Sequence, residues 1–528
     1  MNSLKPMLLT SLKSYNRSQF IKDVTAGIIV AIIALPLSIA LALASGVGPE
    51  AGIFTAIVAG FVISALGGSS VQIAGPTAAF ATIVAGIVAK DGMDGLVIAT
   101  ILAGIFLVLM GLCHFGSLIK FIPFTITTGF TSGIAVTIVI GQLKDFFGLT
   151  YPDGVKPIET TEKFRAVVEN FSTINIDALI VGAVSLAVLI IAPYIFKRIP
   201  GSLIAVIIGI LMVQFLPLKV STIGNLYTIN NSLPSFHLPA VSFEVVQNAL
   251  PNAFTIAVLA AIESLLSCVV ADGMINGKHR SDMELVAQGA GNIASALFGG
   301  IPATGAIART AANIKNGGRT PVAGMVHAGV LLLILVILMP YASWIPMPTI
   351  AAILFMVAYN MCQWRTFVRL TKTAPKSDIA VLVLTFFLTV IFDLVVAIEI
   401  GMLLSCLLFM KRMSDETGVR SWLYVEEVEE QKRKEQEVRK AKKAGKELSV
   451  EEAQLLAAAA EDEEAAMKEQ ARLREIPREL AVYEITGPLF FGAADRINQI
   501  ETREETKCLV LRMRAVPAVD STAMNSMV

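Results

Sequence analysis

The chain has 528 residues, of which 55% are hydrophobic and 16% are charged, and its formal net charge is zero. A water-soluble globule has no core large enough to hide so much apolar surface, so the composition excludes that class and predicts an integral membrane protein. Residues 20–410 are poor in charge, whereas residues 411–480 are crowded with it. We therefore expect two regions in different surroundings, and no nucleic-acid partner.

The N-terminal and apolar parts of the chain predict a membrane bundle. Residues 1–23 are the predicted cytoplasmic N-terminal segment, because their basic residues are spread through a polar stretch and do not precede a short apolar run. At roughly 20 apolar residues per crossing, and fewer where a helix is broken, residues 24–412 are the predicted transmembrane domain, an all-α polytopic bundle. Its fourteen predicted spans are 24–44, 50–66, 76–90, 96–113, 122–141, 176–195, 200–216, 249–271, 283–298, 302–314, 321–340, 346–362, 378–392 and 395–410.

Basic residues mark one side of this bundle. When the spans are threaded from a cytoplasmic N-terminus, six basic loops fall on the same side, and they contain Lys120, Lys197, 277–280, 315–319, 363–376 and Lys411. Lysine and arginine gather in short cytoplasmic loops. The agreement therefore predicts a multi-pass protein of the cell inner (plasma) membrane with both termini in the cytoplasm.

The C-terminal region changes character twice. Residues 413–479 interleave acidic and basic residues among strong helix formers and are predicted to be a charged helical linker. Residues 480–528 contain two predicted strands, "LAVYEITGPLFFG" and "KCLVLRMRAV", around the helical "AADRINQIE". This pattern predicts a small α/β domain, and because the chain stops about half a domain later we expect that domain to be truncated.

An internal repeat relates two segments of the bundle. "SALGGSSVQIAGPTAAFATIV" begins at Ser64 and "SALFGGIPATGAIARTAANI" begins at Ser295; each has a glycine pair, an irregular stretch, a proline and a short helix-prone run. The copies lie at the third and tenth predicted spans, which divides the bundle into seven plus seven. An odd number of spans per repeat inverts the second copy. Paired, interrupted segments of this kind are typical of inverted-repeat transporters with a site near the membrane midplane.

The two short spans predict an anion site. Helices that begin in mid-membrane at Pro76 and Pro302 would leave free N–H groups in their first turns, and proline suits such a first position. Two such helix ends facing each other attract a negative ligand. Arg309, expected about two turns along the second helix, adds a charge that costs about 2.5–3.5 kcal/mol in mid-membrane. That cost favours anion attraction over a structural tie to a carbonyl or carboxylate.

Longer stretches match a known family. "LPLSIALALASGVGPEAGIFTAIVAGFVISALGGSSVQIAGPTAA", "AAIESLLSCVVADGM", "GKHRSDMELVAQGAGNIASALFGGIPATGAIARTAANIKNGGRTP" and the terminal "DSTA" resemble the SulP (sulfate permease) anion transporters with a C-terminal STAS domain. The "AIESLL" and "TAPKSD" regions are most similar to the DauA-like bacterial branch that carries C4-dicarboxylates or sulfate. The resemblance implies seven-plus-seven inverted repeats of the uracil-permease-like type, a core domain that moves against a gate domain, and homodimers.

The same resemblance assigns residues to a site between the third and tenth spans. The implied substrate-binding residues are Ala74, Gly75, Pro76, Thr77 and Ala78 in the third span, Ala303, Thr304, Gly305, Ala306, Ala308 and Arg309 in the tenth, and Leu35, Pro36 and Ser38 in the first. "DSTA" at 520–523 matches a loop that is phosphorylated in some STAS domains. Ser521 is therefore a regulatory candidate.

Glu263, in the eighth span, is the acidic residue of the implied site. A lone carboxylate among apolar residues could carry a proton with the substrate, or it could pair with Arg309 as a static brace. Sodium-coupled bicarbonate carriers of the family have aspartate at the Glu263 position and threonine where this chain has Ile307, and Ser267 alone does not replace the lost oxygen ligand. We therefore predict proton coupling over sodium coupling.

These observations predict a secondary active transporter of a small anion (sulfate, bicarbonate or a C4-dicarboxylate) that works by proton-coupled symport and alternating access. The alternative hypotheses are an anion exchanger or channel of the same fold, a nucleobase permease, and a membrane-anchored STAS signalling protein. No enzymatic activity, catalytic residue, cofactor or metal site is expected, because the sequence has no Walker A loop, no HExxH motif and no CxxC pair.

Overall fold

The structure, a computed structural model, describes residues 4–117, 123–152, 157–195, 200–227, 232–239, 243–392, 394–421, 479–490, 492, 497, 500, 502, 504 and 506–527. The chain divides into two compact units, Met1–Leu403 and Leu404–Val528. The predicted linker beyond residue 421 and most of the predicted helix at 493–501 lie outside the described residues.

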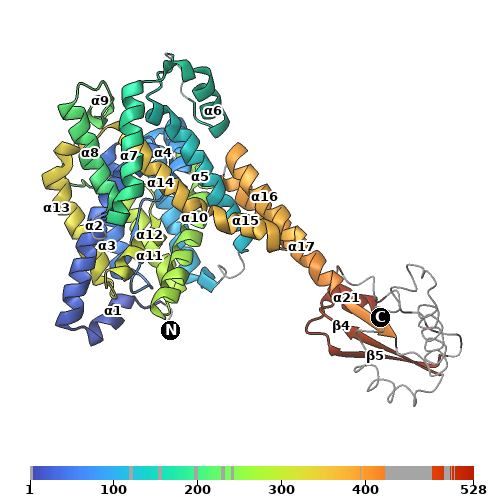
Figure 1. Ribbon diagram of the computed structural model, residues 1–528. Coiled ribbons are helices and arrows are strands. Elements are labelled where there is room, and N and C mark those ends of the chain that lie inside the picture. The colour runs from blue at the N-terminus through green and yellow to red at the C-terminus, as the bar shows by residue number, and fades with distance from the viewer. Residues whose placement is uncertain are drawn as a thin grey trace. The chain divides into compact units, whose positions relative to one another are not determined.

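The first unit is almost entirely helical (Figure 1). Within the described residues, eight helices are long and apolar enough to cross a membrane, which confirms a mostly helical membrane domain; fourteen spans remain a prediction. The α-helices are α1 (Met7–Ser11), α2 (Arg17–Ala44), α3 (Pro49–Leu66), α4 (Ala78–Leu112), α5 (Phe124–Phe147), α6 (Thr160–Glu169), α7 (Ile176–Ile195), α8 (Gly201–Phe215), α9 (Ile223–Leu226), α10 (Phe243–Ile275), α11 (Ser281–Leu297), α12 (Ile307–Lys315), α13 (Val322–Leu338), α14 (Met347–Cys362), α15 (Trp364–Thr373), α16 (Lys376–Ile391) and α17 (Leu394–Asp415).

Helix α4 is interrupted at Gly92. This residue has φ 72° and ψ −171°, a conformation that essentially only glycine adopts. It lies in an exposed turn with Lys90, Asp91 and Asp94. The charged turn separates two apolar helical segments, which explains why hydropathy divides this stretch into the predicted spans 76–90 and 96–113.

Helix packing divides the first unit into two groups. In the central group, α11 packs against α3 and α4, α10 against α4 and α12, and α13 against α2 and α3. In the lateral group, α14 packs against α5 and α7, α16 against α5, and α7 against α8. The hydroxyls of Ser185 in α7 and Thr349 in α14 lie 2.8 Å apart within this lateral group. Helix α2 also contacts α8 and α14, so the groups adjoin along it.

A buried carboxylate joins the start of α2 to the chain before α13. Asp23 Oδ1 accepts a hydrogen bond from the Arg319 N–H at 2.9 Å, and Asp23 Oδ2 accepts from the hydroxyls of Thr320 at 2.6 Å and Tyr15 at 3.1 Å. Burial, with the Asp23 charge, raises the pKa of the Tyr15 phenol to about 12, so this donor keeps its proton at neutral pH. The cluster fixes the connection between α12 and α13 against the N-terminal end of α2.

The second unit contains a three-stranded sheet in the order β3-β4-β5. Strand β3 (Gly418–Ser421) runs antiparallel to β4 (Leu480–Thr486), which runs parallel to β5 (Cys508–Ala515). The helix α21 (Ser521–Ser526) follows, and the buried core consists of Ile485, Leu489, Ile497 and Ala523. The two strands predicted from the sequence are confirmed as β4 and β5. Strand β3 lies in the range predicted as helical linker, because its short run is stabilised by pairing with the distant β4 and not by a local pattern.

Candidate functional site

Two short buried strands join the repeat copies inside the central group. Strand β1 (Ala74–Gly75) pairs antiparallel with β2 (Thr304–Gly305), with Ala74 opposite Gly305 and Gly75 opposite Thr304. The Ala306 N–H extends the pairing by donating to the Ile73 carbonyl at 2.9 Å. The two interrupted stretches therefore meet directly, and the starts of α4 and α12 meet with them. We refer to residues 73–78 and 303–309 as the junction.

The helices at the junction begin later than the prolines predict. Helix α4 begins at Ala78 and α12 at Ile307, after N-cap residues Thr77 and Ala306 in extended conformation. The expected starts at Pro76 and Pro302 are wrong, because the backbone stays extended through the paired strands and the N-caps. Neither N-cap side chain bonds to its helix, so within the described part of the chain both first turns lack a side-chain cap for their N–H groups, as an anion site requires.

Arg309 lies in the first turn of α12, not two turns along as expected, because α12 begins at Ile307. Its side chain is 3% exposed and spans the junction. Nη2 donates long hydrogen bonds to Ser38 Oγ (3.4 Å) and the Pro76 carbonyl (3.3 Å). Nη1 has no hydrogen-bond partner among the described residues, and a Cβ on Gly75 would overlap it. A buried guanidinium with unused donors beside two open helix starts is suited to bind an anion.

Glu263, in α10, lies on the α4 side of the junction. The Thr77 hydroxyl donates to Glu263 Oε2 at 3.0 Å, so the carboxylate contacts the N-cap residue of α4. Among the described residues no ion pair joins Glu263 to Arg309, whose Nη2 bonds to Ser38 and Pro76. The geometry gives no support to a static brace between the two charges.

The other predicted site residues lie in the junction itself or in α2 and α10, which both pack against α12. Buried at it are Pro36, Ser38, Ala74, Gly75, Pro76, Ala78, Ala303, Thr304 and Gly305. More accessible are Leu35, Thr77, Glu263, Ala306 and Ala308. Ile307, at the start of α12, is 43% exposed. Its apolar side chain offers no oxygen ligand to a sodium ion. Among the described residues, no three His, Cys, Asp or Glu side chains lie together in a group that could hold a metal ion.

A buried carboxylate that sequence reasoning missed supports the chain before β1. Glu284 Oε2, in α11, accepts hydrogen bonds from the N–H groups of Gly68 (2.9 Å) and Ser69 (3.1 Å). Its Oε1 accepts from the side chains of Gln72 (2.9 Å) and Gln288 (3.0 Å). These four donors satisfy the hydrogen-bonding capacity of the buried carboxylate and fix the position of residues 68–72, which lead into β1.

The same face of α11 supports β2. Asn292 Nδ2 donates to the Ala303 carbonyl at 2.9 Å, and Asn292 Oδ1 accepts from the Ala303 N–H at 2.8 Å. Ser295 Oγ donates to the Ile301 carbonyl at 2.8 Å. Residues 284, 288, 292 and 295 are three or four positions apart, so they share one helix face. This polar stripe inside an apolar span was the signal that could have identified α11 as the scaffold of the junction.

Helices α10 and α12 complete the support. Thr310 Oγ1 accepts from the Ile73 N–H at 3.0 Å, and the Thr304 hydroxyl donates to the Ala260 carbonyl at 3.1 Å. The Ser267 hydroxyl donates to Thr310 Oγ1 at 3.4 Å. The junction is therefore held by hydrogen bonds from three helices, and Ser267 already has a structural partner.

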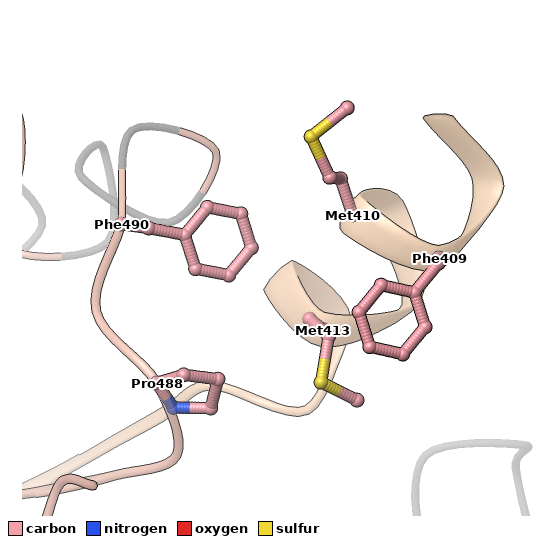
Figure 2. Close-up of a pocket in the computed structure, with 5 residues that line it drawn as sticks. All are labelled: Phe409, Met410, Met413, Pro488 and Phe490. Carbon is pink, nitrogen blue, oxygen red and sulfur yellow. The ribbon is translucent and has the colours of Figure 1, made fainter. Parts of the chain in front are cut away.

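The second unit has a hollow of different chemistry. Figure 2 shows Pro488 and Phe490 facing the end of α17. The hollow has a volume of about 290 Å³ and is lined by Phe409, Met410, Met413, Pro488 and Phe490. These side chains are all apolar and do not suit a small anion. Ser521, the regulatory candidate, is exposed at the first position of α21, next to the N-cap residue Asp520.

Comparison with known sequences identifies relatives along most of the chain. The profile of the Sulfate permease family matches residues 20–385. A Bacillus subtilis protein named as a sulfate transporter, YvdB, is 38% identical over 520 residues, which cover 97% of this chain and 88% of the relative. The bicarbonate transporter BicA of a Picosynechococcus species is 33% identical over 404 residues, covering 74% of this chain and 70% of the relative. These relatives are transporters and not enzymes.

Solved structures show the same fold. The transmembrane domain of a cyanobacterial bicarbonate transporter BicA superposes with a TM-score of 0.66 at 28% identity, covering 73% of this chain and 98% of that chain. The structure of SLC26A9 superposes with a TM-score of 0.80 at 18% identity, covering 99% of this chain and 84% of that chain. At that identity the second likeness is evidence for the fold alone.

Proposed function

Since the chain belongs to the sulfate permease family, we propose that it is a secondary active transporter of a small anion, namely sulfate, bicarbonate or a C4-dicarboxylate, and that it binds this anion at the junction. The observation that carries the proposal is the buried Arg309 guanidinium, whose Nη1 is unpartnered beside the uncapped first turns of α4 and α12. An anion there would accept from Nη1 and from first-turn N–H groups while largely removed from water, where such bonds are strong.

The relatives support sulfate or bicarbonate as substrate, because the relatives carry those names. The resemblance to the dicarboxylate branch adds succinate and fumarate as candidates. A thermal-shift panel on the purified protein with sulfate, bicarbonate, chloride, succinate and fumarate would identify the substrate class. Stabilisation by none of these anions would contradict an anion site.

The role of Arg309 is testable by substitution. Arg309→Ala removes the only charged side chain among residues 73–78 and 303–309. We therefore expect the affinity for the stabilising anion to fall at least about 100-fold, in line with the loss of a buried charged hydrogen-bond partner. The matched control is Arg165→Ala, which alters an exposed arginine on α6. Anion binding measured by isothermal titration should be unchanged in the control. Equal affinities in Arg309→Ala and the wild type would rule out the site.

We further propose that Glu263 couples transport to protons. A protonated Glu263 can donate a hydrogen bond to Thr77 where the carboxylate now accepts one, so proton uptake changes the bonding of the α4 N-cap. In proteoliposomes, uptake driven by an inward proton gradient should be lost in Glu263→Gln, while uptake driven by the anion gradient alone persists. Undiminished proton-driven uptake by Glu263→Gln would exclude this role. Dependence on an exchangeable internal anion, with no response to pH, would indicate the exchanger alternative.

The wider architecture forms part of the same proposal. Two inverted repeats of seven spans would explain why two similar segments meet antiparallel at β1 and β2. We propose that the central group moves against the lateral group in a homodimer of the inner membrane, with both termini in the cytoplasm. The second unit would then be a STAS domain whose exposed Ser521 is a phosphorylation candidate.

A further inference from the structure

A histidine of α13 has a hydrogen-bonding demand that the described residues do not meet. His327 is fully buried, and neither Nδ1 nor Nε2 has a partner among the described residues. A buried imidazole usually has at least one of its nitrogens paired, because leaving both without partners is costly. Such a group in the interior of a membrane domain calls for a functional explanation.

The packing of α13 places His327 in the layer of the junction. Helix α13 packs against α2, which contributes Ser38, and against α3, which contacts β1. Gly324, one turn before His327, packs so closely that a Cβ there would overlap Ser64 of α3 and lie 3.4 Å from Ile73, the residue preceding β1. Residues three apart share a helix face. His327 therefore faces the same layer, in which the Ile73 N–H and carbonyl bond to Thr310 and Ala306, on either side of Arg309 in the chain.

The unpaired hydrogen-bonding groups of Arg309 and His327 are complementary. Arg309 has only donors, and its Nη1 is unused. A neutral imidazole offers one acceptor nitrogen and one N–H donor, and a second positive charge beside a buried guanidinium is unfavourable. One buried water between two such groups can accept from the guanidinium and donate to the acceptor nitrogen of the imidazole when they are too far apart to bond directly.

We propose that His327 is a positioning residue for the anion site: as a neutral imidazole it accepts, through one buried water, a hydrogen bond from Arg309 Nη1 and so fixes the guanidinium in the orientation that meets the anion. This inference rests on the proposed function, since it assigns the group that orients the binding arginine. It also explains why Nη2, and not Nη1, donates to Ser38 and Pro76.

Binding of radiolabelled sulfate to the purified full chain tests the proposal. His327→Leu should raise the sulfate Kd about tenfold, whereas His327→Gln, whose amide keeps an acceptor and a donor, should stay within about twofold. In an Arg309→Lys background, which lacks Nη1, His327→Leu should add less than about twofold. A full tenfold effect in that background, or an unchanged Kd in His327→Leu, would overturn the proposal; lost thermal stability with unchanged Kd would show that the role is only structural.

A second measurement needs no anion. The chain has four histidines, so ¹⁵N-histidine spectra are simple and His327→Gln assigns the signal. Arg309→Lys should shift the His327 resonance, and the control Arg165→Lys should not. An unmoved His327 resonance in Arg309→Lys would overturn the proposed link between the two side chains, whether or not an anion binds. A lack of binding by every tested anion would instead count against the proposed function and leave this link standing.

Discussion

Arg309 is buried but only partly hydrogen-bonded, because its neighbours offer few acceptors and little bulk. Gly75 has no side chain, so the guanidinium lies against the β1 backbone, and the Ser38 and Pro76 contacts occupy only Nη2. A buried arginine held by weak contacts on one side and open on the other is poorly compensated. The remaining donor is therefore the part of the junction that gains most from an arriving anion.

Gly75→Ala tests this close approach. The added methyl group would overlap Arg309 Nη1, and such overpacking typically costs about 1–3 kcal/mol. We expect sulfate affinity to fall about tenfold or more, measured by isothermal titration. Gly141→Ala in α5 is the control, because a Cβ there meets nothing within 4 Å. Equal affinities in the two variants would show that Gly75 does not set the position of the guanidinium.

At this scale the sequence predicted the isolated charges and missed the supporting ones. Arg309 and Glu263 stand out because each is a lone charge in an apolar segment. Glu284 does not stand out, since it lies near a helix start with Asp282, and its partners at Gly68 and Gln72 are about 210 positions away. Local spacing shows that a group is polar, but only the fold shows which distant donors it receives.

Interrupted helices are the defining elements of the molecule. The sequence predicted two short helices with uncapped starts. The structure has the short α12 and, as the second, the segment of α4 before Gly92, and it adds the strands that delay both starts. A two-residue strand carries almost no pattern of its own. Ala74–Gly75 and Thr304–Gly305 become strands only because they pair with each other, which no local signal reports. The turn at Gly92 is the opposite case, because glycine and its charged neighbours mark it locally.

Gly92→Ala tests whether that turn has to be a glycine. A side chain at φ 72° and ψ −171° is strained by about 1–3 kcal/mol, so we expect a lower midpoint of thermal unfolding in detergent. The matched variant is Gly86→Ala in the same helix, where a Cβ meets nothing within 4 Å and helix propensity improves. If both variants melt together, the turn relaxes without cost.

The first unit contains two helix groups that differ in which predicted residues they hold. The central group contains every predicted substrate-binding residue, Glu263 and the scaffold on α11, whereas the lateral group contains none of them. The repeat in the sequence predicted where the copies lie but not which helices pack together. Packing partners such as α11 with α4 are separated by more than 150 positions, and apolar spans offer few features to tell one partner from another.

A cross-link inside the lateral group tests whether it moves as one body. Ser185→Cys with Thr349→Cys replaces two hydroxyls that lie 2.8 Å apart, so the thiols should form a disulfide between α7 and α14. In a background with Cys113, Cys362, Cys406 and Cys508 replaced by serine, sulfate uptake by the oxidised protein should equal that of the reduced protein. Uptake that stops on oxidation and returns with reductant would show that α7 and α14 must slide during transport.

The pairing of β1 with β2 has a mechanical consequence. Backbone hydrogen bonds tie Ala74–Gly75 to Thr304–Gly305, and one face of α11 grips the chain before both strands. These hydrogen bonds hold the two halves of the junction together, so we expect them to move as one rigid body and not to separate from each other. Under the proposed mechanism the anion therefore stays bound at a junction of constant shape. What alternates between the two faces of the membrane is the access path to that junction, and not the binding geometry.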